Sequence, residues 1–139
     1  MKGISIDEMK LGDWAEFAKT IAESDIYLYA GITGDLNPAH VNEQYAGTTF
    51  FKTRIAHGML AAGLISAVLG TKLPGPGTIY LQQQLKFTAP VRIGDTITAR
   101  AEVVEINKEK NRVRLNTTVT NQTGTTVITG EALVSPPKA

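Results

Sequence analysis

The chain contains 139 residues, of which 42% are hydrophobic and 19% are charged, and its formal net charge is +1 at pH 7. This composition is ordinary for a globular protein, and the length predicts one domain over residues 1–139 that buries about two-thirds of its unfolded surface. The small net charge, without any basic run, argues against binding to nucleic acid or an anionic membrane. The chain has no cysteine, which excludes disulfides, a thiolate nucleophile and a thiolate metal site.

The beginning of the chain bears on its localisation. Residues 1–14 read MKGISIDEMKLGDW, with several charged residues and no apolar core, so we expect no signal peptide. The longest apolar stretch, residues 55–70, contains His57 and is shorter than a bilayer span. Both features predict a cytoplasmic protein.

The first third of the chain predicts one strand and two short helices. Residues 14–22 alternate loosely between apolar and polar side chains and are expected to form a strand. Ser24 is a suitable N-cap for a helix over residues 25–32, whose first turn carries an acidic residue that suits the helix dipole. A second short helix is expected over residues 38–45.

A change in hydrophobic period divides the rest of the chain. Residues 48–54 have the character of a loop. Residues 57–69 are rich in Ala, Leu and Met and apolar on every side, which is typical of a buried helix. After a turn at residues 74–77 the period becomes two, as in half-buried strands. Four strands are predicted, over residues 78–88, 96–106, 112–121 and 125–135.

The short turns between the last three strands indicate antiparallel hairpins. A sheet of this kind has one apolar face that another element must cover. The helix over residues 57–69 is the candidate for that cover, because it has no wet face. We therefore predict an α+β protein with the hot-dog fold, in which an antiparallel sheet wraps around one long buried central helix.

The most informative motif lies where the second short helix begins. Gly34 and Asp35 precede Asn37, a good N-cap, and Pro38, which fits the first helical position, and His40 follows near the third. A sharp turn here would aim the Asp35 carboxylate and the His40 imidazole into one pocket, where they can hold a water molecule and move protons both ways. Gly-Asp is also ordinary turn chemistry, and a histidine in a first turn is often simply exposed.

Three segments resemble those of one enzyme family. Residues 29–40, YAGITGDLNPAH, closely resemble the hydratase 2 motif of the MaoC-like, R-specific enoyl-CoA hydratases. Residues 54–60, RIAHGML, are similar to the second landmark of that family, and residues 79–95 are similar to the third. The resemblance extends from about residue 26 to the C-terminus and also implies the hot-dog fold.

The resemblance implies an enzyme that hydrates trans-2-enoyl-CoA reversibly to the R alcohol, with no cofactor and no metal. Asp35 and His40 are the expected catalytic pair, and because they lie around one tight turn the addition should be syn. The backbone N–H of Gly58, at the start of the central helix, is expected to stabilise the thioester oxyanion, although a glycine there would also permit tight packing. His57 is expected to be a buried, hydrogen-bonded structural histidine rather than a catalyst. A metal site formed by His40, His57 and Asp35 is conceivable, but these residues do not have metal-ligand spacing.

Four further residues are candidates for the substrate site. Asn37 is expected to hydrogen-bond there, although its capping role already explains it. Ser66 resembles a pocket-lining position of the family, and a bond back to its own helix would explain it equally well. Leu69 and Leu133 are candidates for setting acyl-chain selectivity, with plain core packing as the alternative.

Three other functions fit parts of the same pattern: dehydration of 3-hydroxyacyl groups on acyl carrier protein, hydrolysis of acyl-CoA by a hot-dog thioesterase, and non-catalytic binding of acyl thioesters. The motif from Asp35 to His40 argues against the thioesterase, and the intact set of Asp35, His40 and Gly58 argues against a non-catalytic subunit. An open sheet leaves an edge and a face to cover, so we expect a homodimer, as the resemblance also implies.

Overall fold

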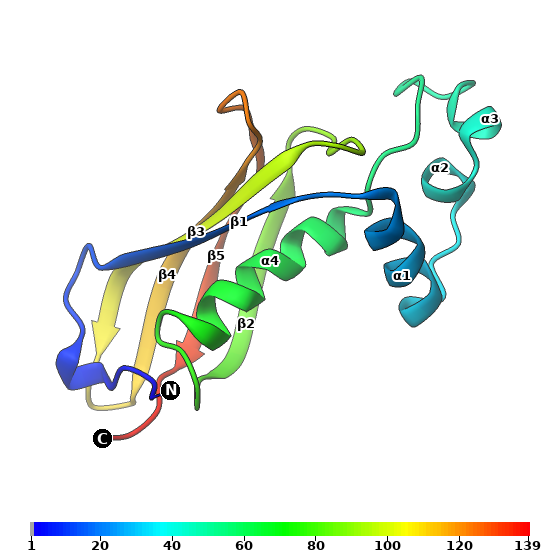
Figure 1. Ribbon diagram of the computed structural model, residues 1–139. Coiled ribbons are helices and arrows are strands. Elements are labelled where there is room, and N and C mark those ends of the chain that lie inside the picture. The colour runs from blue at the N-terminus through cyan, green and yellow to red at the C-terminus, as the bar shows by residue number, and fades with distance from the viewer. Residues whose placement is uncertain (1) are drawn as a thin grey trace.

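The computed structural model describes residues 2–139. Five antiparallel strands form one sheet in the order β1-β3-β4-β5-β2, and helix α4, Gly58–Thr71, lies across one face of it (Figure 1). This is the predicted hot-dog arrangement. The strands are β1, Trp14–Thr20; β2, Ile79–Phe87; β3, Thr96–Asn107; β4, Arg112–Thr120; and β5, Thr126–Ser135.

Alternation of side chains in the strands places the core between the sheet and α4. In β3 the residues Ile97, Ala99, Ala101 and Val103 are buried, and the residues between them are partly exposed. The buried face of α4 supplies the other half of the core. Burial of apolar surface stabilises the folded state by about 25 cal/mol per Å². The shared core therefore holds α4 against the sheet and sets the direction in which its N-terminus points.

Helix α4 is less completely buried than the sequence predicts. Ala61, Leu64, Ile65 and Val68 are buried, whereas positions 59, 63, 66 and 70 are exposed. These exposed positions are three or four residues apart, so they lie on one face of the helix. The apolar character of that face therefore reflects an open surface rather than a second buried one, and the prediction of a helix buried on every side is wrong for the single chain.

The first helix starts earlier than predicted. Helix α1 spans Glu23–Thr33 and its N-cap is Ala22, so Ser24 lies inside the first turn and is not the cap. The Asp25 carboxylate accepts a hydrogen bond from the Ala22 N–H at 2.8 Å and pairs with Lys19 at 2.9 Å. An acid at the third helical position can reach back to the N-cap backbone, which explains why Ser24 is not needed.

The second predicted helix is divided in two. Helix α2 spans Pro38–Val41, helix α3 spans Glu43–Ala46, and Asn42 between them has an extended backbone. The Asn42 side chain accepts a hydrogen bond from the Tyr45 N–H at 3.0 Å, so it ends one helix and caps the next. Asparagine favours such caps over helix interiors because its side chain competes for backbone N–H groups.

The strands after α4 lie where the alternating pattern predicts them, each within about one residue at its ends. β1 is shorter than predicted, because α1 begins at Glu23. The three helices α1, α2 and α3 lie together beyond one end of the sheet, and both termini lie at the opposite end (Figure 1). We call residues 23–46 the overhang. Among residues 2–139, no helix is long and apolar enough to cross a bilayer.

Candidate active site

The overhang carries the predicted Asp35–His40 motif on a sharp turn. Gly34 has a positive φ of 82°, which glycine adopts at little cost and which ends α1. The Asn37 side chain accepts a hydrogen bond from the Ala39 N–H at 3.0 Å, and Pro38 is the first residue of α2. The predicted cap is therefore confirmed, and it places Asp35 on the loop and His40 in the helix.

The His40 ring is held in one tautomer by the main chain. It is nearly buried, and its Nδ1 lies 2.7 Å from the Ile55 carbonyl oxygen. A carbonyl oxygen can only accept, so His40 Nδ1 carries the proton and Nε2 is left as the basic nitrogen of the neutral ring. The Ile55 N–H in turn donates to the Ala39 carbonyl at 3.3 Å. Ile55 thus grips α2 through both of its backbone groups.

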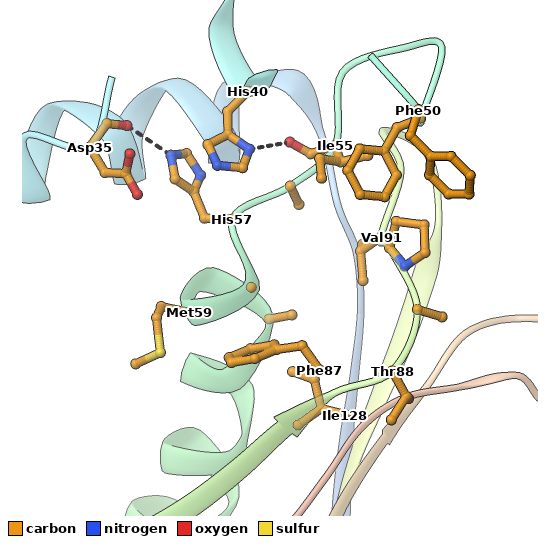
Figure 2. A pocket seen from close by; sticks show the side chains of 16 residues that line it. Asp35, His40, Phe50, Ile55, His57, Met59, Phe87, Thr88, Val91 and Ile128 are labelled. Carbon is orange, nitrogen blue, oxygen red and sulfur yellow. Dashed lines mark hydrogen bonds between the residues drawn. The ribbon is translucent and has the colours of Figure 1, made fainter. Parts of the chain in front are cut away.

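His57 joins this pair although its spacing in the sequence gives no sign of it. Its ring is 2% exposed, and its Nε2 donates to the Asp35 carbonyl oxygen at 2.9 Å. Its ring centroid lies 3.9 Å from that of His40 and 4.6 Å from that of Tyr29. One nitrogen or oxygen atom from each of Asp35, His40 and His57 lies within 4.8 Å of the others, which is close enough to hold a metal ion. Figure 2 shows the three side chains side by side.

An apolar cavity of about 550 Å³ opens beside these groups (Figure 2). Asp35, His40 and His57 lie together at one end of it, the polar end (Figure 2), and Gly58, which directly follows His57 in the chain, also lines the cavity. Most of the remaining wall is apolar, and three phenylalanines contribute to it, two from the loop after α3 and one from the end of β2. The apolar wall includes Phe50, Phe51, Ile55, Met59, Phe87, Val91 and Ile128. A flat, apolar chain attached to one polarised group fits such a cavity, because such sites combine apolar walls with a few fixed polar groups.

Gly58 is the first residue of α4, so its N–H has no acceptor within the helix. A Cβ atom at this position would lie 2.6 Å from Cε1 of Phe87, at the end of β2. Tight packing, which was the alternative explanation for this glycine, is therefore a real requirement here. It is compatible with an oxyanion role, because the same close approach leaves the Gly58 backbone at the cavity wall.

Four candidate substrate residues do not line this cavity. Asn37 caps α2. Ser66 lies on the open face of α4, in a separate shallow groove of about 390 Å³ that shares Met59 with the cavity. Leu69 is 1% exposed in the core of the protein. Leu133 is half-buried in β5 between two buried residues, so its side chain points to the other face of the sheet.

A cluster of charges centred on Arg54 anchors the overhang. The Arg54 side chain contacts Glu43 at 2.8 Å, Glu23 at 3.3 Å and the Tyr27 hydroxyl at 2.7 Å. Hydrogen bonds from the Thr53 hydroxyl and the Arg54 guanidinium hold the pKa of Glu43 below its ordinary value. The bond to Glu43 raises the pKa of Arg54 above its usual range. Arg54, which directly precedes Ile55 in the chain, therefore holds α1 and α3 together.

Comparison with known proteins assigns the chain to a family. Residues 11–126 match the family described as the MaoC like domain, so the chain belongs to the MaoC-like dehydratase family. It is 63% identical to the (R)-specific enoyl-CoA hydratase of Rhodospirillum rubrum, over 94% of this chain and 90% of that protein. It is 47% identical to the 3-hydroxybutyryl-CoA dehydratase of Methylorubrum extorquens, over 99% and 87%. The structure of the unliganded R-hydratase PhaJ1 from Pseudomonas aeruginosa superposes with a TM-score of 0.93 at 50% identity, over 99% of this chain and 88% of that one.

The lowered pKa of Glu43 predicts how the anchoring of the overhang depends on pH. The folded state favours ionised Glu43, so its stabilising effect is complete above the ordinary glutamate pKa of 4.5 and is lost as the pH falls through the lower folded value. We expect Glu43→Gln to melt at a lower temperature than the wild type at pH 7, and the difference to shrink below about pH 4.5. Calorimetric or circular-dichroism melts across that range measure it.

The control for this measurement is Glu109→Gln, in the exposed turn after β3. Its melting curve should follow that of the wild type at every pH. A difference between the wild type and Glu43→Gln that stays constant through the acid range would contradict the assignment of the stabilisation to the ionised Glu43 carboxylate.

Proposed function

We propose that this chain is an (R)-specific enoyl-CoA hydratase that interconverts trans-2-enoyl-CoA and (R)-3-hydroxyacyl-CoA. The observation that carries the proposal is the meeting of Asp35, His40 and the Gly58 backbone on the wall of one apolar cavity. Hydration of a conjugated thioester needs a base for water, a proton for C2 and a donor for the thioester oxygen. These three groups supply them, and two relatives with this activity in their names are 63% and 39% identical.

The proposed reaction adds one water molecule across the C2–C3 double bond, without oxidation or reduction. Water bound between Asp35 and His40 gives a proton to the pair as its oxygen adds to C3, and the pair returns a proton to C2. Neutral His40 can accept at Nε2, because Nδ1 is occupied by the Ile55 carbonyl. The Gly58 N–H, at the positive end of α4, donates to the thioester oxygen as negative charge builds there. No metal or cofactor takes part in these steps.

The acyl chain would lie along the apolar wall of the cavity. We propose that it reaches Ser66 where the shallow groove continues past Met59. Asn37 supports the site by fixing the turn before His40. Leu69 and Leu133 remain candidates for chain-length selectivity, although neither lines the cavity: Leu69 is buried in the core and Leu133 points to the other face of the sheet.

The hydratase is tested with crotonyl-CoA. The product should be oxidised by an R-specific 3-hydroxyacyl-CoA dehydrogenase and ignored by an S-specific one, and hydration in deuterated water should give the syn product by NMR. Asp35→Asn and His40→Asn should each lower the rate by ~10²–10⁴-fold, and the double variant should be little worse. Asparagine at position 40 keeps a donor for the Ile55 carbonyl, so the variant retains that bond while it removes Nε2 together with the rest of the ring.

Rival functions give different products in the same assay. A thioesterase would release free thiol, and a non-catalytic subunit would leave crotonyl-CoA unchanged. A dehydratase that works on acyl carrier protein would accept a 4′-phosphopantetheine thioester as readily as the CoA substrate. An S product, or near-normal turnover by a well-folded single variant of Asp35 or His40, would overturn the proposal.

Gly58 is proposed to act through its N–H, and a matched pair of variants can isolate that group. Alanine and proline both introduce a Cβ that must displace the Phe87 ring, but only proline lacks the N–H. Gly58→Pro should therefore be slower than Gly58→Ala by roughly 10²–10³-fold, the usual effect of losing one oxyanion donor. Proline is tolerated at the first helical position, so both variants should melt alike. Equal rates would place the donor elsewhere.

We also propose that two copies of the chain form a homodimer. β2 is an edge strand with exposed Ile79, Leu81 and Phe87, and the open face of α4 beside it exposes Met59. An unpaired edge next to an apolar face is suited to a second copy related by twofold symmetry. Light scattering should give twice the mass of one chain, and Gly63→Glu, on the open face, should give one. Gly31→Glu, on α1, is the control, because both positions have free space for a side chain.

A further inference from the structure

We propose that His57 is a positioning residue that holds both members of the catalytic pair, a role that rests on the proposed hydratase function. Asp35 and His40 reach the cavity from a loop and a short helix of the overhang. His57 belongs to neither, because it is the N-cap of α4. It makes a direct contact with each of the two residues, and the two contacts use different parts of its ring.

The first contact fixes the Asp35 loop. His57 Nε2–H donates to the Asp35 carbonyl oxygen at 2.9 Å. The other hydrogen bonds of Asp35 are local: its N–H donates to the Thr33 hydroxyl, and its carboxylate accepts from the Asn37 N–H. The residue is exposed, so burial does not hold it. Among residues 2–139, the bond from His57 is therefore the hydrogen bond that ties Asp35 to the rigid central helix.

The second contact fixes the plane of the His40 ring. The two imidazole centroids are 3.9 Å apart and the ring planes are inclined by 32°, so the faces of the rings lie against one another (Figure 2). His40 is also held at Nδ1 by the Ile55 carbonyl. One bond in the ring plane and one contact on the ring face leave a single orientation for His40 Nε2.

The remaining nitrogen of His57 gives this arrangement a chemical consequence. Because Nε2 donates to a carbonyl, Nδ1 of the neutral ring carries a lone pair, and this buried atom has no hydrogen-bond partner among the described residues. The centroid of the His57 ring lies 3.9 Å from that of the His40 ring. A neutral, electron-rich ring at that distance favours the positive charge that His40 acquires when it takes a proton from water. Electrostatic effects of this kind are strong in a buried site, because the fixed group needs no reorganisation.

Helix capping does not explain the side chain of His57. The residue occupies the N-cap position of α4, yet its side chain makes no capping hydrogen bond, and the Leu60 and Ala61 N–H groups are satisfied by its backbone carbonyl. Serine, threonine, asparagine or aspartate would cap the helix better. The imidazole instead contacts Asp35 and His40, which accounts for a buried polar ring at a position where stability alone favours another residue.

Two variants separate the contacts. His57→Gln places an amide donor near the position of Nε2 and removes the ring, whereas His57→Phe keeps a ring face against His40 and removes the donor. For crotonyl-CoA hydration, we expect each to lower kcat by ~10–100-fold, by analogy with the loss of a partner that orients a metal-ligating histidine, with little change in KM. In an Asp35→Asn background, either substitution should lower the rate by less than about twofold further, because it acts through the pair.

The control is Ile26→Val, which shortens a fully buried side chain of α1 that does not line the cavity. It lowers the melting temperature and should leave kcat unchanged. If His57 were only structural, its variants would resemble this control, or their effects would multiply fully with that of Asp35→Asn. Either result would overturn the proposal, even with the hydratase activity of the wild type intact.

A measurement on the free protein tests the same contacts without turnover. Nitrogen-15 NMR of the wild type should show a protonated Nδ1 and a bare Nε2 for His40, with ring protons that exchange slowly. In His57→Gln and His57→Phe the His40 ring should lose this single orientation, seen as faster exchange and shifted ring resonances. Unchanged His40 resonances in both variants would contradict the positioning role. A wild type that lacks hydratase activity but gives the expected spectra would overturn the function alone.

Discussion

The site depends on five consecutive residues, 54–58, that lead from the overhang into α4. Each of them makes a different attachment, and together they hold the turn that carries Asp35 and His40 against the start of α4. Arg54 binds Glu23 and Glu43, Ile55 binds Ala39 and His40, Ala56 donates to Val91, His57 contacts Asp35 and His40, and Gly58 packs on Phe87. Because α4 is fixed by the hydrophobic core, these attachments give the overhang a fixed position relative to the cavity.

The apolar cavity also favours the proton transfers expected of the Asp35 carboxylate and the His40 imidazole. A carboxylate and an imidazole are modest catalysts in water, and their effect grows where the walls are apolar and the donors are already in place. Here the polar groups gather at one end of the cavity, and Phe51, Phe87 and Ile128 line the rest. The tautomer of His40 is set by a carbonyl, and the proposed oxyanion donor is set by a helix terminus, so neither needs to reorganise during the reaction.

Local patterns predicted most of the fold, and of the candidate site residues Asp35, His40 and Gly58 line one cavity. Strand alternation located β3 and β4, and the Asn37-Pro38 pair located α2, because each depends on contacts within a few residues. The wrong predictions concern positions where two residues could make the same backbone hydrogen bonds, and sequence spacing does not decide between them. Asp25 reached back to cap α1 in place of Ser24, and Asn42 divided a helix. His57 was predicted to be buried and hydrogen-bonded, and the structure confirms both properties. Its contact with His40 depends on the path of the intervening chain, which local sequence patterns do not reveal.

Helix α4 connects the candidate active site with the open surface. Its buried face packs on the sheet, its N-terminus lies at the proposed catalytic groups, and its other face is open. Met59 lies at the junction, because it lines both the cavity and the groove on the open face. A second copy covering that face, as proposed, would enclose the groove along which we propose that the acyl chain lies. Assembly would then exclude water from the substrate tail, while the Asp35–His40 pair stays within one chain.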